Sequence, residues 1–316
     1  MNASKPLFNR LALIGVGLIG SSIARAARAQ GVVGSIVTTA RSAQTRKRVQ
    51  ELGIADKVVG TNAEAVKDAD LVIVCIPVGA SGAVAKEIGP HLKMGAIISD
   101  VGSVKGSVLR DMAPHLPNNV HFIPAHPVAG TEYSGPDAGF AELFVNRWCI
   151  LTPPENANAE AVERLATFWR ALGANVETMS AEHHDLVLAI TSHVPHLIAY
   201  TIVGTADELG AVTRSEVLKF SAGGFRDFTR IAASDPTMWR DVFLANKDAV
   251  LEMLGRFNED ISSLTRAIRM GDGDALFDLF TRTRAIRKGI VEIGQDSPAP
   301  DFGRPHPHLS DQTTKD

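Results

Sequence analysis

The chain of 316 residues is long enough for two domains, and its 45% content of apolar residues can supply a sizeable core. Its formal net charge of −3 argues against a general nucleic-acid binder, which needs a basic face. The two cysteines provide neither a disulfide framework nor a four-cysteine metal site. We find no signal-peptide pattern and no apolar run approaching the roughly 20 residues that cross a bilayer. These features predict a cytoplasmic globular protein with no membrane or nucleic-acid partner.

Short apolar strands alternate with helical patterns in the first half of the chain. The predicted strands cover residues 11–14, 35–40, 71–77, 96–102, 121–126 and 148–153, and helices fit 18–31, 43–52, 80–89 and 105–113. Strands that alternate with helices are typical of a parallel sheet covered on both faces. The pattern therefore predicts an α/β fold with a doubly wound sheet of the Rossmann type.

The character of the sequence changes near residue 175. From Ser180, a plausible helix N-cap, strand signals almost disappear, and apolar residues recur at helical spacing from Leu186 to Thr201. Further helices fit residues 214–220, 237–269 and 273–293. We predict a Rossmann domain over residues 1–175 and an all-helical domain over 176–293. The Pro-, Asp- and Ser-rich tail, 294–316, is expected to be disordered.

The glycine pattern GVGLIG places Gly15, Gly17 and Gly20 between a strand and a helix. In a dinucleotide site the first glycine allows the tight turn, the second lets a pyrophosphate approach, and the third lets helix and strand pack closely. The helix start, at Leu18 and Ile19, offers unpaired N–H groups to phosphate oxygens. The alternative is a glycine turn that binds nothing, but the strand–turn–helix context favours a dinucleotide.

The end of the second predicted strand bears on the choice of cofactor. NAD-specific folds usually carry Asp or Glu there, whereas this chain reads TTARSAQTRKR, without an acid. Arg41, Ser42 and Arg46 could instead hold a 2′-phosphate, which arginine binds with a matched fork. The sequence therefore favours NADP and leaves NAD open, since Arg41 could equally stack on adenine.

Three further strand ends point to the nicotinamide half of the site. Ile76 and Pro77 end one strand, Ser103 follows the next, and His126 ends the predicted strand 121–126. Ligands bind outside the carboxyl ends of strands in open α/β sheets, so these residues should converge. A histidine with a pKa near neutrality can deprotonate an alcohol as it becomes a carbonyl or a phenol. The alternative for His126 is a loop histidine with only local hydrogen bonds.

Two groups of polar residues mark the helical half. His193 and His196 share one helical face, but Pro195 lies between them and no third ligand has a recognisable spacing, so we predict no metal site.

In the second group, Arg226, Asp227 and Arg230 lie among apolar residues beside a predicted loop at Gly223–Gly224. An arginine held in this way could anchor a carboxylate by bidentate hydrogen bonds. The alternative is structural ion pairing, of Arg226 with Asp227 or of Arg230 with Asp235.

The motifs GVGLIGSS, DVGSVKG, HPVAGTEYSGP, SHVPH and GGFRDFTRIAASDPTMW occur in this order, from about residue 10 to 293. Together they resemble the prephenate/arogenate (cyclohexadienyl) dehydrogenase family of tyrosine biosynthesis. The resemblance implies a Rossmann domain joined to a helical domain that forms an intertwined homodimer. It also implies oxidative decarboxylation of prephenate or arogenate to 4-hydroxyphenylpyruvate or tyrosine, and it leaves feedback by tyrosine open.

The resemblance further implies roles for individual residues. His126 is then the catalytic residue that interacts with the ring hydroxyl, Ser103 helps to place that hydroxyl and His126, and Arg230 binds a substrate carboxylate. The residues expected to line the pocket or its entrance are Glu132, His193, His196 and Trp239. Because Arg41 stands where many members have an acid, NAD dependence does not follow from the resemblance.

Asp227 is the residue we expect to influence the choice between the two substrates. If Arg230 holds the side-chain carboxylate, Asp227 could lie near the ammonium group that only arogenate carries. The alternative is that Asp227 pairs with Arg226 or caps a helix.

Two other functions compete with this interpretation. A β-hydroxyacid dehydrogenase or imine reductase also pairs a Rossmann domain with helices, but typically has a catalytic lysine, which the motifs of the second domain lack. The other is an inactive NADP-sensing protein, against which the joint presence of Ser103, His126 and Arg230 argues.

Overall fold

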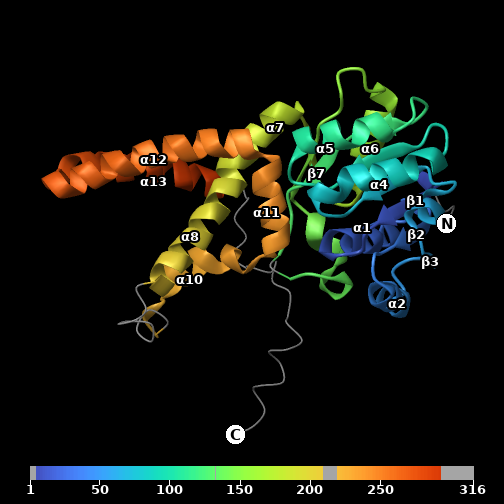
Figure 1. Cartoon of the computed structure of the whole chain (residues 1–316), viewed down its shortest axis with the longest axis horizontal. Coiled ribbons are helices and arrows are strands. Elements are labelled where there is room, and N and C mark those ends of the chain that lie inside the picture. The colour runs from blue at the N-terminus through green and yellow to red at the C-terminus, as the bar shows by residue number, and fades with distance from the viewer. Residues whose placement is uncertain (1–4, 132, 209–218, 293–316) are drawn as a thin grey trace, which may run out of the picture. The chain divides into compact units, whose positions relative to one another are not determined.

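The computed structural model describes residues 5–131, 133–208 and 219–292 (Figure 1). The chain forms two compact units, residues 1–258 and 259–316, of which the first holds every residue discussed as a site. The expected tail, 294–316, lies outside the described residues. The predicted domain boundaries at 175 and 293 stay predictions.

A six-stranded parallel sheet, in the order β3-β2-β1-β4-β5-β6, forms the centre of the first unit. Its strands are β1 (Phe8–Ile14), β2 (Val33–Thr39), β3 (Lys57–Val59), β4 (Leu71–Val74), β5 (Ile97–Asp100) and β6 (His121–Phe122). All four residues of β4 are buried, as expected for a central strand covered on both faces. The predicted Rossmann architecture is confirmed, although β3 was not predicted.

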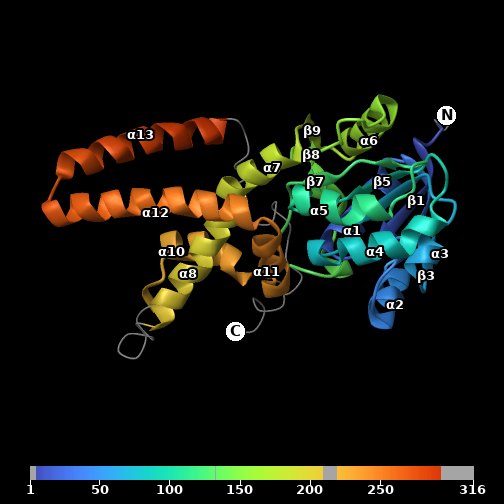
Figure 2. The same cartoon turned by 45° about the horizontal axis from the view of Figure 1, so that its top comes forward.

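Helices connect the parallel strands and cover the sheet. They are α1 (Leu18–Ala29), α2 (Ala43–Glu51), α3 (Asn62–Val66), α4 (Ser81–Ile88), α5 (Lys105–Met112) and α6 (Ala159–Ala171). Helices α4 and α5 lie side by side in both views (Figures 1 and 2). Apolar residues of β1, β4 and β5 pack against α3, α4 and α5 in one buried cluster. This core fixes the strand ends from which the candidate site is built.

The predicted strand 121–126 is two strands that belong to different sheets. Ile123 still donates its N–H to Ile98 of β5, but Pro124 has no N–H, and its carbonyl accepts the N–H of Thr152 instead. The chain therefore leaves the parallel sheet at Pro124 and enters β7 (Ala125–Pro127), which pairs antiparallel with β8 (Trp148–Leu151). Strand β9 (Asn175–Thr178), which was not predicted, pairs parallel with β8 (Figure 2). The expectation that His126 ends a strand of the main sheet was wrong.

Helices make up the rest of the described chain. They are α7 (Ala181–Leu188), the π turn η6 (Ala189–His193), α8 (Val194–Glu208), α10 (Gly223–Thr229), α11 (Pro236–Ala245), α12 (Lys247–Met270) and α13 (Gly273–Glu292). Ser180 caps α7 as predicted, since its hydroxyl accepts the N–H of His183. The predicted helix 237–269 is interrupted at Asn246, and Gly223 and Gly224 begin α10 rather than forming a loop. Most of the predicted helix 214–220 falls outside the described residues.

The buried face of the segment from α7 to α8 differs from the predicted one. Leu186 and Ile190 are exposed, whereas His184 and His193 are fully buried. His184 lies against His126 of β7 and His193 against Asn246, while part of the apolar pattern is left at the surface.

By length and composition alone, residues 181–208 could span a membrane, which corrects our expectation that no run is long and apolar enough. Histidines and other polar residues interrupt the apolar runs of this segment, although its mean hydropathy is high. Within this segment His184 contacts His126 and His193 contacts Asn246, so the side of the segment that carries these two histidines lies in the protein interior.

Candidate active site of a dinucleotide-dependent oxidoreductase

The glycine loop between β1 and α1 has the shape of a dinucleotide cradle. Gly15 has a positive φ of 90°, and a Cβ added there would lie 2.3 Å from the carbonyl oxygen of Cys75. A Cβ added at Gly20 would lie 2.3 Å from the carbonyl oxygen of Gly15, whereas one at Gly17 meets no heavy atom within 4 Å. The first and third glycines thus allow close packing, and the middle one faces open space, as a pyrophosphate requires.

The start of α1 completes this cradle. Gly17 is the N-cap and has no side chain to cap the helix, so N–H groups of the first turn, which begins with Leu18 and Ile19, are available to an anion. Ile76, predicted to line the same site, lies directly under the loop, because its Cγ2 is 2.9 Å from the position of a Gly15 Cβ. Pro77 follows as the residue before a short 3₁₀ turn. The residues present therefore fit a dinucleotide.

The loop after β2 presents arginine side chains and a helix N-terminus. Arg46 donates from Nη1 to the carbonyl oxygens of Ala40 (2.6 Å) and Arg41 (3.1 Å), which fixes the path of this loop. The hydroxyl of Ser42 caps α2 by accepting the N–H of Thr45 at 2.9 Å. Arg41 is exposed. This arrangement holds a positive, acid-free corner at the predicted 2′ position.

His126 lies in the middle of β7, and only 8% of it is exposed. Both backbone groups of the preceding residue, Ala125, are hydrogen-bonded. Its N–H donates to Asp100 Oδ1 (3.1 Å), and its carbonyl accepts from Lys105 Nζ (2.7 Å). Asp100 is the last residue of β5, and Ser103 follows on the same loop. The backbone next to His126 is thus held by residues on either side of Ser103, although His126 itself belongs to a second sheet, and the joint role of His126 and Ser103 stays a prediction.

Two side chains that the sequence analysis missed form a row with His126. His126 Nδ1 is 2.9 Å from His184 Nε2, and His184 Nδ1 is 2.8 Å from Asp185 Oδ1. The carboxylate of Asp185 also accepts the backbone N–H groups of Lys105 (2.7 Å) and Gly106 (2.8 Å), at the start of α5. The HHD triplet within an apolar helix was the available signal.

Burial and neighbouring charge keep His126 neutral. Removal from water lowers the pKa of His126 well below its usual 6.5, and the neighbouring His184, Lys105 and His193 lower it further when charged. Burial lowers the pKa of His184 as well, against the opposing effect of Asp185. A neutral imidazole at physiological pH has a lone pair that can accept a proton, as a general base must.

A buried ion pair lies next to the strand that carries His126. The ammonium of Lys105, which is fully buried, is 2.5 Å from Asp100 Oδ2, and that carboxylate oxygen also accepts the N–H of Gly102 at 2.7 Å. The pair connects β5, the Ser103 loop, α5 and β7. It is therefore part of the frame that positions the candidate base.

His193 and His196 make different contacts rather than facing a common ligand. His193 Nδ1 is 3.1 Å from the amide nitrogen of Asn246, and burial lowers the pKa of His193 to about 4. His196 donates from Nδ1 to the carbonyl of Ser192, and its ring stacks on Trp239 with centroids 3.6 Å apart. Within the described residues, no group of three or more His, Cys, Asp and Glu side chains could hold a metal ion.

The remaining predicted substrate residues lie on α10 and beyond it. Arg230, exposed in the single chain, is close enough to His196 for its charge to lower that histidine's pKa. Asp227 Oδ1 accepts from Arg226 Nε at 3.1 Å, the structural pair named as the alternative, and both side chains are more than two-thirds exposed. A substrate role for Asp227 stays a prediction, and Glu132 lies outside the described residues.

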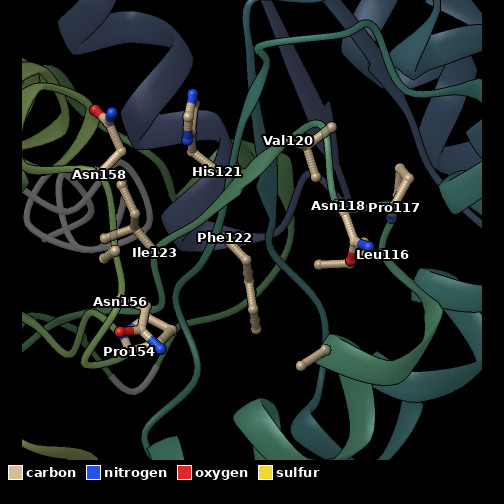
Figure 3. A pocket seen from close by; sticks show the side chains of 12 residues that line it. Leu116, Pro117, Asn118, Val120, His121, Phe122, Ile123, Pro154, Asn156 and Asn158 are labelled. Atoms are coloured by element: carbon tan, nitrogen blue, oxygen red, sulfur yellow. The ribbon is translucent and has the colours of Figure 1, made fainter.

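A cavity elsewhere in the first unit contains none of these residues (Figure 3). It lies between the edge strand β6, residues 116–118 and the turn at 154–158, with Phe122 projecting into it. The glycine loop and His126 are not among its lining residues, so it is separate from the candidate active site.

Sequence comparison identifies the family. The nucleotide-binding domain of prephenate dehydrogenases matches residues 23–178, and their dimerization domain matches residues 180–282. A cyclohexadienyl dehydrogenase of Zymomonas mobilis is 44% identical over 284 residues, which cover 90% of this chain and 97% of that protein. The chain belongs to the prephenate dehydrogenase family. A prephenate dehydrogenase of Bacillus subtilis is 34% identical, over 88% of this chain and 75% of its own length.

Solved structures of the family share the fold. Prephenate dehydrogenase of Aquifex aeolicus, in complex with hydroxyphenyl propionate and NAD+, matches with a TM-score of 0.83 and 31% identity, over 89% of this chain and 98% of that one. Arogenate dehydrogenase of Synechocystis matches with a TM-score of 0.74 and 25% identity, over 89% and 99%. Family membership makes this chain an oxidoreductase with a nicotinamide cofactor.

Proposed function

We propose that this chain catalyses the oxidative decarboxylation of prephenate or arogenate, in the synthesis of tyrosine. One observation carries the proposal: a buried, neutral histidine lies beside the loop that follows β5, in a chain whose glycine loop fits a dinucleotide. The relatives named above, which include prephenate, cyclohexadienyl and arogenate dehydrogenases, support this reaction and leave the choice between the two substrates to the assay.

Each part of the site has a separate role in this reaction. The glycine loop holds the dinucleotide, which accepts the hydride when bound. His126 accepts the proton of the ring hydroxyl, which allows a carbonyl to form and the carbon dioxide to leave from the opposite ring carbon. Ser103 places the hydroxyl against His126, and Arg230 binds a substrate carboxylate. Aromatisation of the ring drives the reaction, so the protein has to align groups and take one proton. A positioned base typically contributes about 10²–10⁴-fold.

We propose NADP as the preferred cofactor. The loop after β2 has no acid to accept a ribose 2′-hydroxyl, and Arg41 is exposed at this corner, next to the N-terminus of α2. Arginine binds phosphate with bidentate geometry, so a 2′-phosphate would find a matched partner. NAD remains the alternative that the assay below compares.

We also propose a cytoplasmic homodimer formed by the helical half, with residues 1–175 and 176–293 as the two domains. The dimerization domain of the family covers residues 180–282. Large apolar side chains are exposed on the helices of this half, among them Ile202, Val203, Leu244 and Leu251. Such exposure in a single chain is typical of a surface that a partner covers. Feedback inhibition by tyrosine, which is the product from arogenate and resembles the product from prephenate, belongs to the same proposal.

The test is reduction of NAD+ and of NADP+ by the purified protein with prephenate and with arogenate. We expect His126→Asn to keep cofactor affinity and to lower kcat at least about 10²-fold, the lower end of general-base effects. His121→Asn, a histidine on β6 away from the site, is the matched control and should keep parental kcat. Turnover of His126→Asn within a fewfold of the parent would rule out His126 as the base. Oxidation of β-hydroxyacids in place of both substrates would overturn the proposed reaction.

A further inference from the structure

We propose that His184 and Asp185 are positioning residues that hold His126 in the one tautomer able to accept a proton at Nε2. The inference rests on the proposed role of His126 as the base and goes beyond it, because neither residue is assigned any role above. Its basis is the row of side chains from Asp185 through His184 to His126.

The first step is the direction of the hydrogen bond at Asp185. Its Oδ1 and Oδ2 accept the N–H groups of Lys105 and Gly106, so the carboxylate acts as an acceptor on both oxygens. An ionised carboxylate has no proton to donate. The contact of 2.8 Å with His184 therefore requires that His184 Nδ1 has the hydrogen.

The second step transmits this choice to His126. Burial lowers the pKa of both histidines, so each ring is neutral and has a single N–H. With the hydrogen of His184 on Nδ1, its Nε2 is an acceptor, and His126 Nδ1, at 2.9 Å, has to donate. His126 Nε2 is then unprotonated. Among the described residues, no hydrogen bond occupies this nitrogen.

The third step concerns rigidity. Val104, the N-cap residue of α5, has no polar side chain, and Asp185 caps this helix from 80 residues further along the chain. Gly106 allows the approach, since a Cβ there would lie 2.9 Å from Asp185 Oδ2. Asn246 supports the backbone of the same residue by donating to the Asp185 carbonyl at 2.8 Å. One carboxylate thus fixes both the helix after Ser103 and the ring of His126.

The decisive variant is Asp185→Leu. Leucine has no acceptor, so the hydrogen of His184 is no longer held on Nδ1. That ring then donates from Nε2 to His126 Nδ1, and His126 is protonated on Nε2 instead. We expect kcat to fall at least about tenfold, towards the range for a lost or wrongly protonated base, with KM for substrate changed less than threefold. Asp185→Asn is the matched control: Asp185 Oδ1 accepts both from His184 and from the N–H of Lys105, so the Asn carbonyl stays on this side, keeps the tautomer and should keep kcat within a fewfold of the parent.

Variants of His184 separate orientation from bulk. His184→Gln keeps a carbonyl oxygen that can accept from His126 Nδ1, whereas His184→Leu has no acceptor. We expect kcat of His184→Gln to exceed that of His184→Leu at least about tenfold, within the range attributed to a correctly oriented base. Urea unfolding of each variant is measured in parallel, since Asp185 also caps α5.

Nitrogen-15 NMR of the imidazole rings tests the tautomer directly, in the free protein and without turnover. We expect His126 protonated on Nδ1 in the parent and in Asp185→Asn, and a larger share protonated on Nε2 in Asp185→Leu. A parent ring protonated on Nε2 would overturn the proposal. So would parental kcat in both Asp185→Leu and His184→Leu while His126→Asn is inactive, an outcome that leaves the proposed function intact. Parental kcat in His126→Asn would instead overturn the proposed function itself.

Discussion

The buried ion pair next to the candidate active site tests how burial changes the contribution of a charge pair to the free energy of unfolding. Lys105 and Asp100 are 2.5 Å apart with side chains 0% and 3% exposed. Lys93 and Asp70 are also 2.5 Å apart, but with side chains 48% and 12% exposed. The two pairs share residue types and distance, so Lys105→Met and Lys93→Met differ chiefly in the surroundings of the charge that each removes.

We expect Lys105→Met to lower the free energy of unfolding severalfold more than Lys93→Met does. Removing one partner of a buried pair typically costs about 3–5 kcal/mol because the other charge stays buried without compensation. Asp100 would still accept the N–H groups of Gly102 and Ala125, so we expect about 3 kcal/mol, the lower end of that range. The solvated pair of Lys93 should contribute only about 0–1 kcal/mol.

The assay is urea unfolding at neutral pH, without cofactor and at one protein concentration, because a dimer's stability depends on concentration. Equal losses of unfolding free energy in the two variants would refute the reasoning. The pH dependence of kcat/KM adds a second measurement. Since the charge of Lys105 lowers the pKa of His126, Lys105→Met should move the acidic limb to higher pH, and Lys93→Met should leave it in place. His184, His193, Asp100 and Asp185 are the other charged or titratable groups near this ring, and both variants retain them.

Three further predictions follow from the site. An unfolded imidazole has a pKa near 6.5, whereas burial lowers the pKa of His193 to about 4. Between these values the unfolded state binds more protons than the folded state, so the urea midpoint should fall as pH decreases from about 6.5 to 4. A constant midpoint would contradict this. Arg41→Asp should shift the ratio of kcat/KM values towards NAD, because a carboxylate accepts the 2′-hydroxyl and repels the 2′-phosphate; strong NAD preference in the parent would show that the loop was misinterpreted. Asp227→Asn should weaken the use of arogenate while sparing prephenate, and an equal loss for both would make Asp227 structural.

Local patterns were sufficient to predict the sheet and the cofactor loop. The alternation of buried strands with helices fixes which strands are parallel, and the glycine spacing predicts a turn whose geometry at Gly15, Gly17 and Gly20 agrees with it. Strand β3 was not predicted because its three residues are too few to show a periodic pattern. The transfer of the chain at Pro124 was visible in principle, since proline cannot donate to a sheet, but its new partner β8 lies more than 20 residues further on.

The helical half was harder to predict because the apolar residues of the segment from α7 to α8 do not all lie on its buried face. Leu186 and Ile190 follow the apolar spacing, yet they are exposed in the single chain. His184 and His193 are buried instead, and each compensates for lost water with hydrogen bonds to residues distant in sequence. When a helix buries histidines and exposes apolar residues, the usual division into a polar and an apolar side no longer indicates its orientation.

The row behind His126 shows where single-sequence reasoning reaches its limit. Two local anomalies were present: helix α5 starts after Val104, which cannot cap it, and the triplet His183–His184–Asp185 interrupts an apolar pattern. Each anomaly implies a partner, since helix N–H groups and buried imidazoles both need one. Neither anomaly identifies that partner, because a carboxylate can cap a helix from any distance along the chain once the fold brings it there. The pairing of Asp185 with α5 is thus a property of the folded chain, and the tautomer of His126 depends on it.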